Sequence, residues 1–323
     1  MSALGEFDLI ARYFTRMPQR ATLGVGDDCA LLAALPAGQQ LAVSCDMLVE
    51  GRHFLSSVAP ERLGHKALAV NLSDLAACGA EPVAFTLALA MPRVDEAFLA
   101  GFARGMFALA DDHRIELVGG DTTAGPLNIC ITVFGAVPVG QALLRSGACV
   151  GDDLWVSGAL GDARLALEVF RGTVALGSDA FAAVRARMEC PTPRVALGQA
   201  LRGVASSAID LSDGLVGDLG HVLTRSGVGA MVDADALPRS AALASQPLAL
   251  QRQCTLAGGD DYELLFTAAA TGESAVLAAA DRAGVAVSRI GRIQAVPGLR
   301  LVDGQGVPMA QRFAAFDHFR AEP

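Results

Sequence analysis

Aspartates recur at separated points of the sequence, mostly beside glycines or at the ends of apolar runs, and carboxylates placed in this way can bind metal ions. The positions that stand out are Asp28, Asp46, Asp74, Asp121, Asp210, Asp213 and Asp260. Taken singly, each also fits a helix cap or a solvated turn, where aspartate is common. Taken together, they form a set of hard oxygen ligands that suits Mg²⁺ and not zinc. Combined with glycine-rich turns, this set indicates chemistry on nucleotide phosphates.

Two of these aspartates fall within otherwise apolar segments, where solvation alone is a poor explanation. Asp46 interrupts a predicted strand over residues 40–49, and an unpaired carboxylate there is costly unless it lies at an edge or end of the strand. Asn71 and Asp74 are three residues apart in a predicted helix over 60–79, so they share one face of that helix. The spacing therefore favours a functional role for these polar groups over simple solvation.

A glycine-rich segment, Gly119–Thr123, follows a predicted strand over residues 115–118. Ligands of open α/β sheets bind at this end of the strands, although such a segment can also be an ordinary turn. Glycines allow close approach of the backbone, whose amides can meet phosphate oxygens. His53, which lies beside Arg52, can likewise hold a phosphate, although a single histidine is more often structural.

The composition excludes several classes of protein. The chain has 323 residues, of which 52% are hydrophobic, and its net charge is −9. An acidic chain is a poor candidate for nucleic-acid binding, which needs a basic face, and it suits an anionic membrane surface no better. Lys66 is the only lysine and is not followed by Ser or Thr, so a P-loop kinase is excluded.

The cysteines and the N-terminus predict a cytoplasmic protein. The seven cysteines are odd in number and form no CxxC motif, so we expect reduced and mostly buried thiols in a reducing compartment. The first residues lack the basic and apolar regions of a signal peptide. No apolar run reaches the roughly 18 to 20 residues that span a membrane.

Alternating strand and helix patterns predict an α/β chain of two domains, with a glycine-punctuated stretch around residues 139–152 as the boundary. The predicted domains are 1–139, for nucleotide and metal binding and dimerisation, and 140–323, which completes the nucleotide and substrate site. Further predicted helices cover 6–17, 95–112, 161–171, 178–187, 194–204, 214–226 and 272–284. Further predicted strands cover 83–91, 127–137, 153–157, 206–210, 229–232, 262–268 and 286–293.

These motifs, in this order, resemble the thiamine-phosphate kinase family of the aminoimidazole-ribonucleotide-synthetase-like superfamily. The resemblance extends over essentially the whole chain, through GEFDLIARYF, GVGDDCALL, HKALAVNLSDLAACGAEP, GGDTT, LRSGA, IDLSDGL, GGDDYELLF and FDHF. It implies transfer of the γ-phosphoryl group of ATP to thiamine monophosphate, with several Mg²⁺ ions. It also implies a two-domain fold in which the N-terminal domains of two subunits pair into a barrel-like dimer core.

The resemblance also implies roles for individual residues, with metal binding and positioning in place of a catalytic acid or base. The magnesium positions are Asp28, Ser44, Cys45 (through its backbone), Asp46, Asp74, Asp121, Asp210 and Asp213, of which Asp74, Asp121 and Asp210 are the most critical. The ATP positions are Gly120, Asp121, Arg145 and Ser212. The substrate positions are His53, Asp260 and Phe316. Asp260 stands where close relatives often have Glu, and Phe316 where some have Tyr or Trp.

Two other functions fit the same residues. Another ATP-dependent synthetase or ligase of the superfamily would use similar metals and nucleotide contacts on an amide substrate. A non-catalytic nucleotide or divalent-cation binding protein would use the acids only as ligands, although no EF-hand spacing is present. ATP consumption and the identity of the product separate these possibilities.

Overall fold

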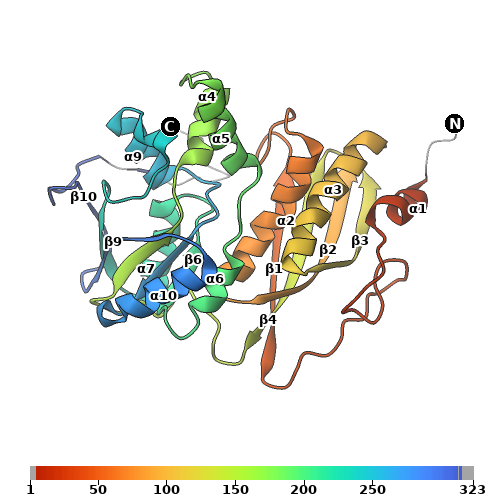
Figure 1. Ribbon diagram of the computed structural model, residues 1–323, viewed down its shortest axis with the longest axis horizontal. Helices are drawn as coiled ribbons and strands as arrows, with labels where there is room; N and C mark the ends of the chain where they lie inside the picture. The colour runs from red at the N-terminus through yellow and green to blue at the C-terminus, as the bar shows by residue number, and fades with distance from the viewer. Residues whose placement is uncertain (1–4, 312, 315–323) are drawn as a thin grey trace. The chain divides into compact units, whose positions relative to one another are not determined.

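The computed structural model describes residues 5–311 and 313–314 and divides the chain into two compact units (Figure 1). Unit 1 comprises Met1–Leu75 and Ala80–Gly140, and unit 2 comprises Ala76–Gly79 and Gln141–Pro323. Each unit contains its own mixed sheet with helices against it. The prediction of an α/β chain is therefore confirmed.

Unit 1 is a four-stranded sheet in the order β1-β4-β2-β3. Its strands are β1 (Gln39–Val49), β2 (Glu81–Met91), β3 (Glu116–Ala124) and β4 (Asn128–Pro138), and its helices are α1 (Glu6–Leu9), η1 (Ile10–Phe14), α2 (Pro60–Ala77) and α3 (Glu96–His113). β4 pairs antiparallel with β1 and β2, whereas β2 and β3 are parallel. In Figure 1, α2 and α3 lie side by side along the sheet.

Two glycines let α2 and α3 approach closely. A Cβ atom on Gly64 would stand 2.0 Å from the carbonyl oxygen of Phe102, and one on Gly105 would stand 1.8 Å from that of Glu61. Any larger residue at either position would push the helices apart. This close contact helps to fix α2, which carries Asn71 and Asp74, in a buried position.

Unit 2 is a six-stranded sheet in the order β10-β7-β9-β5-β8-β6. Its strands are β5 (Asp153–Ser157), β6 (Ser207–Asp210), β7 (Gly229–Asp233), β8 (Leu264–Ala268), β9 (Val287–Gln294) and β10 (Gly298–Val302). Its helices are α4 (Asp162–Phe170), α5 (Ser178–Glu189), α6 (Val195–Ala200), α7 (Leu215–Ser226), α8 (Ala241–Ala244), α9 (Leu248–Ala257), η2 (Ala270–Gly272) and α10 (Glu273–Ala283).

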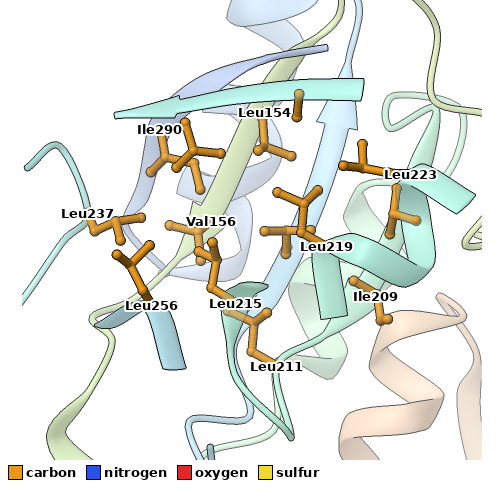
Figure 2. Close-up of a cluster of buried hydrophobic side chains, with 14 of the residues drawn as sticks. Leu154, Val156, Ile209, Leu211, Leu215, Leu219, Leu223, Leu237, Leu256 and Ile290 are labelled. Carbon is orange, nitrogen blue, oxygen red and sulfur yellow. The ribbon is translucent and has the colours of Figure 1, made fainter. Parts of the chain in front are cut away.

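The core of unit 2 lies between α7 and the sheet (Figure 2). Leu215 and Leu219 of α7 pack with Val156 of β5 and Ile209 of β6. Apolar residues four apart on the helix meet alternate residues on the strands, so both periodicities place their buried faces together. This packing fixes the end of β6, where the predicted residue Asp210 lies, and the loop before α7, which contains Ser212 and Asp213.

Several predicted elements differ from the structure. Gly119–Thr123 lies within β3 and is not a turn after it, because the strand continues past the glycines, with a register shift in its pairing to β2. The predicted helix over 6–17 ends at Phe14 and closes as a π-helix. The sequence patterns also missed α8, α9 and β10. These are short or weakly periodic segments, which leave little pattern to detect.

The prediction of mostly buried cysteines is wrong. Cys29, Cys45 and Cys149 are exposed, and only Cys254 is buried. Cys29 and Cys149 lie in segments outside the helices and strands, and Cys45 lies on β1, on the face whose other residues are also exposed. Among the residues that the structure describes, no helix is long and apolar enough to cross a bilayer.

Candidate phosphate and metal site

In unit 1, the polar residues of β1 and α2 contact one another. The Ser44 hydroxyl donates to Asp74 Oδ2 at 2.5 Å, and the Asp46 backbone N–H donates to Asn71 Oδ1 at 3.1 Å. Ser44 and Asp46 are two apart on the strand, and Asn71 and Asp74 are three apart on the helix, so each pair shares a face. The structure therefore brings this face of β1 against the polar face of α2, with Ser44 bonded to Asp74 and Asp46 bonded to Asn71.

Asp121 lies elsewhere in the same sheet. It is exposed on β3, the edge strand opposite β1. Asp46 pairs with Ile131, Ile131 with Leu87, and Leu87 with Gly120, so three strand spacings separate β1 from β3 at this level. Neighbouring strands lie about 4.8 Å apart, so the backbones of Asp46 and Asp121 are roughly 14 Å apart. Within one copy of unit 1, these two predicted ligands do not meet.

His53 lies in a closed turn at the end of β1. Its Nδ1 accepts the backbone N–H of Val49 at 2.9 Å, and its carbonyl accepts the ammonium of Lys66 at 3.0 Å. Because Nδ1 is an acceptor, the neutral ring carries its proton on Nε2, the nitrogen that can donate to a phosphate oxygen. Lys66 is only 2% exposed, so the single lysine of the chain is a buried support for this turn.

Two other predicted ligands of unit 1 are exposed. Asp28 lies in the turn that contains Gly24 and Gly26, where its backbone N–H donates to Asp27 Oδ1 at 2.8 Å. Cys45, predicted to act through its backbone, has its sulfur 3.4 Å from that of Cys130 on β4. Burial and the contact with Cys45 raise the pKa of Cys130 to about 11, so this neighbouring thiol stays protonated at neutral pH.

In unit 2, the loop between β6 and α7 is held by a residue that sequence analysis missed. Asp218 Oδ2 accepts the backbone N–H groups of Ser212, Asp213 and Gly214, each at 3.1 Å. Burial raises the pKa of Asp218 to about 7, the charge of Asp213 adds to this rise, and the three N–H groups oppose it. The buried carboxyl group of Asp218 thus fixes the loop that carries Ser212 and Asp213.

The turn that contains Asp260 lies beside this loop. The Asp260 backbone N–H donates to the Ser212 carbonyl at 2.9 Å, and the Tyr262 N–H donates to the Leu211 carbonyl at 2.8 Å. Asp261, the next residue of the turn, is buried, and both of its carboxylate oxygens accept the Gly161 N–H at 2.9 Å. Desolvation raises the pKa of Asp261 well above its usual value. Ser212 and Asp260, two of the residues predicted to contact nucleotide and substrate, therefore belong to one hydrogen-bonded arrangement.

Glu263, at the end of this turn, is fully buried among cations. It accepts Arg187 Nη2 at 2.7 Å and Arg194 Nη2 at 2.5 Å, and Ser157 donates its hydroxyl at 2.5 Å. No sequence pattern indicates this cluster, because the partners of Glu263 lie some seventy to a hundred residues away along the chain.

The other predicted residues are distributed as follows. Asp210 is buried at the end of β6, and Arg145 is exposed before β5. Phe316 lies outside the described residues.

In the described part of the chain, no three His, Cys, Asp or Glu side chains gather closely enough to hold an ion by themselves. Magnesium is commonly held by one or two carboxylates together with substrate phosphates and water, so small carboxylate sets of this kind fit that ion.

Sequence comparison shows which proteins the chain is similar to. Residues 26–137 match the AIR synthase related protein, N-terminal domain, and residues 150–304 match the corresponding C-terminal domain. The chain is 46% identical over 324 residues to the thiamine-monophosphate kinase of Salmonella typhimurium, covering 98% of this chain and 99% of that one. The chain belongs to the thiamine-monophosphate kinase family. Its members are phosphotransferases, and both units of this chain lie within the similarity.

Solved structures of the same family share the fold. The crystal structure of thiamine-monophosphate kinase from Stenotrophomonas maltophilia matches with a TM-score of 0.84 at 46% identity, covering 93% of this chain and 95% of that one. A structure of AaThiL complexed with AMPPCP and TMP matches with a TM-score of 0.75 at 28% identity, covering 89% and 90%. The predicted family and its two-domain α/β fold are therefore confirmed.

Proposed function

We propose that this chain transfers the γ-phosphoryl group of ATP to thiamine monophosphate and so forms thiamine diphosphate, in the cytoplasm. The observation that carries the proposal is the full-length similarity to thiamine-monophosphate kinases, at 46% identity. The AaThiL complex supports both substrates, because AMPPCP is an analogue of ATP and TMP is thiamine monophosphate. The partly buried polar contacts between β1 and α2 fit the same activity.

We propose Mg²⁺ as the metal, bound through oxygen ligands. The ligands are Asp28, Ser44, the Cys45 backbone, Asp46, Asp74, Asp121, Asp210 and Asp213. Oxygen donors of this kind are those that Mg²⁺ prefers, and thiolates would select softer metals. Bound Mg²⁺ would supply neutralisation of the charge on the phosphates.

The residues then act by binding and alignment. The acceptor is a phosphate that is already deprotonated near neutral pH, so no general base is needed, and the main barrier is repulsion between two anions. Asp74, Asp121 and Asp210 would hold the metal that neutralises the phosphate charge. Gly120, Arg145 and Ser212 would contact the ATP phosphates. His53 donates from Nε2 to the substrate, Asp260 faces the cationic thiazolium and Phe316 stacks on it. Alignment of donor and acceptor supplies much of the acceleration.

Metal removal gives a direct test. The purified chain, incubated with ATP, thiamine monophosphate and Mg²⁺, is expected to form thiamine diphosphate and ADP in equal amounts, measured by chromatography. An excess of EDTA over Mg²⁺ should lower the rate by at least about a thousandfold, because the phosphates would meet without charge neutralisation, and added Mg²⁺ should restore it. ATP consumption without thiamine diphosphate would favour a synthetase, and nucleotide binding without consumption would favour a binding protein.

We also propose a homodimer that covers the open face of the unit 1 sheet. The residues of β1 that point away from Ser44 and Asp46 are apolar and uncovered, with Leu41 50%, Val43 56% and Met47 53% exposed. A stripe of this kind on one strand is a poor surface to leave in water. A second copy of the chain would bury it, and would also bring further acidic residues to a sheet that separates Asp46 from Asp121.

The Val43→Asp variant tests this surface. A charge in the middle of the stripe should shift the chain from dimer to monomer in sedimentation equilibrium, because an unpaired carboxylate in an interface core is costly. Val94→Asp is the matched control, since Val94 is also exposed, at 44%, but lies outside the sheet. A wild-type chain that sediments as a monomer, or a Val43→Asp variant that remains dimeric, would contradict the proposed interface.

A further inference from the structure

The turn Gly258–Glu263, which connects α9 to β8, has an unusual backbone. Asp260 has a φ of +67° and Tyr262 a φ of +50°. Both lie in the left-handed region that residues with a side chain rarely adopt, and strained residues of this kind cluster at functional sites. The surrounding contacts must offset this cost, and they define where the Asp260 side chain lies.

Three hydrogen bonds to one neighbouring loop fix the backbone of the turn. Asp260 and Tyr262 donate their N–H groups to the loop between β6 and α7, at 2.9 and 2.8 Å, and Leu211 of that loop donates back to the Glu263 carbonyl at 2.9 Å. The side chains of Asp261 and Glu263 are buried and hydrogen-bonded below. The backbone on either side of Asp260 therefore has little freedom.

The side chain of Asp260 is held by Tyr262. Tyr262 is 7% exposed, and its hydroxyl donates to Asp260 Oδ1 at 3.1 Å. A hydroxyl bonded to a charged carboxylate forms a stronger hydrogen bond than one between neutral groups. The aromatic ring is packed, so its hydroxyl is a fixed donor that selects one orientation of the Asp260 carboxylate.

We infer that Tyr262 is a positioning residue, whose hydroxyl orients the Asp260 carboxylate toward the cationic ring of thiamine monophosphate. This inference rests on the proposed function, in which Asp260 faces that ring. The Asp260 side chain is short, with a single methylene group, so its reach depends on a defined orientation. A carboxylate held in one rotamer loses less conformational entropy when the substrate binds, which favours tighter binding.

The Tyr262→Phe variant removes only the hydroxyl. We expect the KM for thiamine monophosphate to rise about tenfold, with kcat and the KM for ATP within about twofold of wild type, because the lost interaction acts on one substrate. Calorimetry should show a matching rise in the Kd of thiamine monophosphate without ATP. The matched control is Tyr13→Phe. Tyr13 is the only other tyrosine, and its hydroxyl also donates to a carboxylate, Glu96 Oε2, at 3.1 Å in unit 1.

A double-mutant cycle separates orientation of Asp260 from general support of the turn. If Tyr262 acts through Asp260, Tyr262→Phe should change the KM for thiamine monophosphate less than twofold in an Asp260→Ala background. An undiminished tenfold effect in that background would overturn the inference, since it would mean that Tyr262 supports the turn itself. Asp260→Asn, which keeps an acceptor but loses the charge, should raise this KM at least as much as Tyr262→Phe.

The outcomes also separate this inference from the proposed function. A wild-type chain that forms thiamine diphosphate, together with a Tyr262→Phe variant of unchanged KM and Kd, would overturn the inference and leave the function intact. A wild-type chain that forms no thiamine diphosphate would overturn the proposed function and the inference with it. Thermal unfolding of each variant shows whether a loss of binding reflects a loss of fold.

Discussion

The Asp74→Asn variant is expected to lose at least about a hundredfold in kcat/KM, which corresponds to about 2.7 kcal/mol of transition-state stabilisation. Removal of the charge weakens a proposed magnesium ligand, and a metal ion contributes several kcal/mol to charge neutralisation in phosphoryl transfer. The asparagine oxygen can still accept the Ser44 hydroxyl, which lies 2.5 Å from Asp74 Oδ2. The fold should therefore persist. The measurement is steady-state kinetics over a range of Mg²⁺ concentrations, where half-maximal activity should require more metal.

The matched control is Asp111→Asn on the neighbouring helix α3. Asp111 is an exposed aspartate that pairs with Arg16 at 2.8 Å, and none of the proposed roles involves it. Its removal should leave kcat/KM and the Mg²⁺ requirement unchanged, and exposed ion pairs of this kind contribute about 0 to 1 kcal/mol to stability. An Asp74→Asn variant with the activity of the Asp111→Asn control would refute the assignment of Asp74 as a metal ligand.

Periodicity predicted most of the regular elements of the fold. The apolar spacing in 60–79 and the alternation in 40–49 correspond to α2 and β1, and the spacing of Asn71 and Asp74 correctly predicted a shared polar face. Periodicity failed where its signal was weak or ambiguous. The glycines before Asp121 look like the end of a strand, although β3 runs through them. The pairing partner that keeps the strand extended is β2, which is distant in the sequence.

The supporting residues of the site could not be predicted from the sequence. Asp218 looks like an ordinary acid in the first turn of a helix, yet its carboxylate accepts three N–H groups of the preceding loop. Lysine is seldom fully buried, yet Lys66 is buried and bonded to the His53 carbonyl. The partners of Asp218 are only four to six residues away, but its burial and that of Lys66 come from tertiary packing. Motif spacing therefore selected the candidate aspartates, but not the groups that support them.

Glu263 is the clearest member of this supporting group, because it is a buried anion with two cationic partners. Its side chain has no solvent exposure, and Arg187 and Arg194 lie within 2.7 Å of its oxygens. A buried ion pair can be close to neutral in net stability, because desolvation of the charges offsets their attraction. Removal of one partner is a different matter, since it leaves the other charges buried and uncompensated.

The Glu263→Gln variant should therefore be destabilised by about 3–5 kcal/mol, because glutamine fills the same volume but leaves both guanidinium groups without a counter-charge. For a unit of this size, the thermal midpoint should fall on the order of 10 °C, measured by calorimetry. The matched control is Glu61→Gln, which removes an exposed ion pair with Arg104 and should cost less than about 1 kcal/mol. Added salt should shrink the effect of Glu61→Gln and leave that of Glu263→Gln nearly unchanged, since ions screen exposed pairs far more than buried ones. A Glu263→Gln variant as stable as the control would mean that the two arginines find other partners, and that this charge cluster does not hold the turn beneath Asp260.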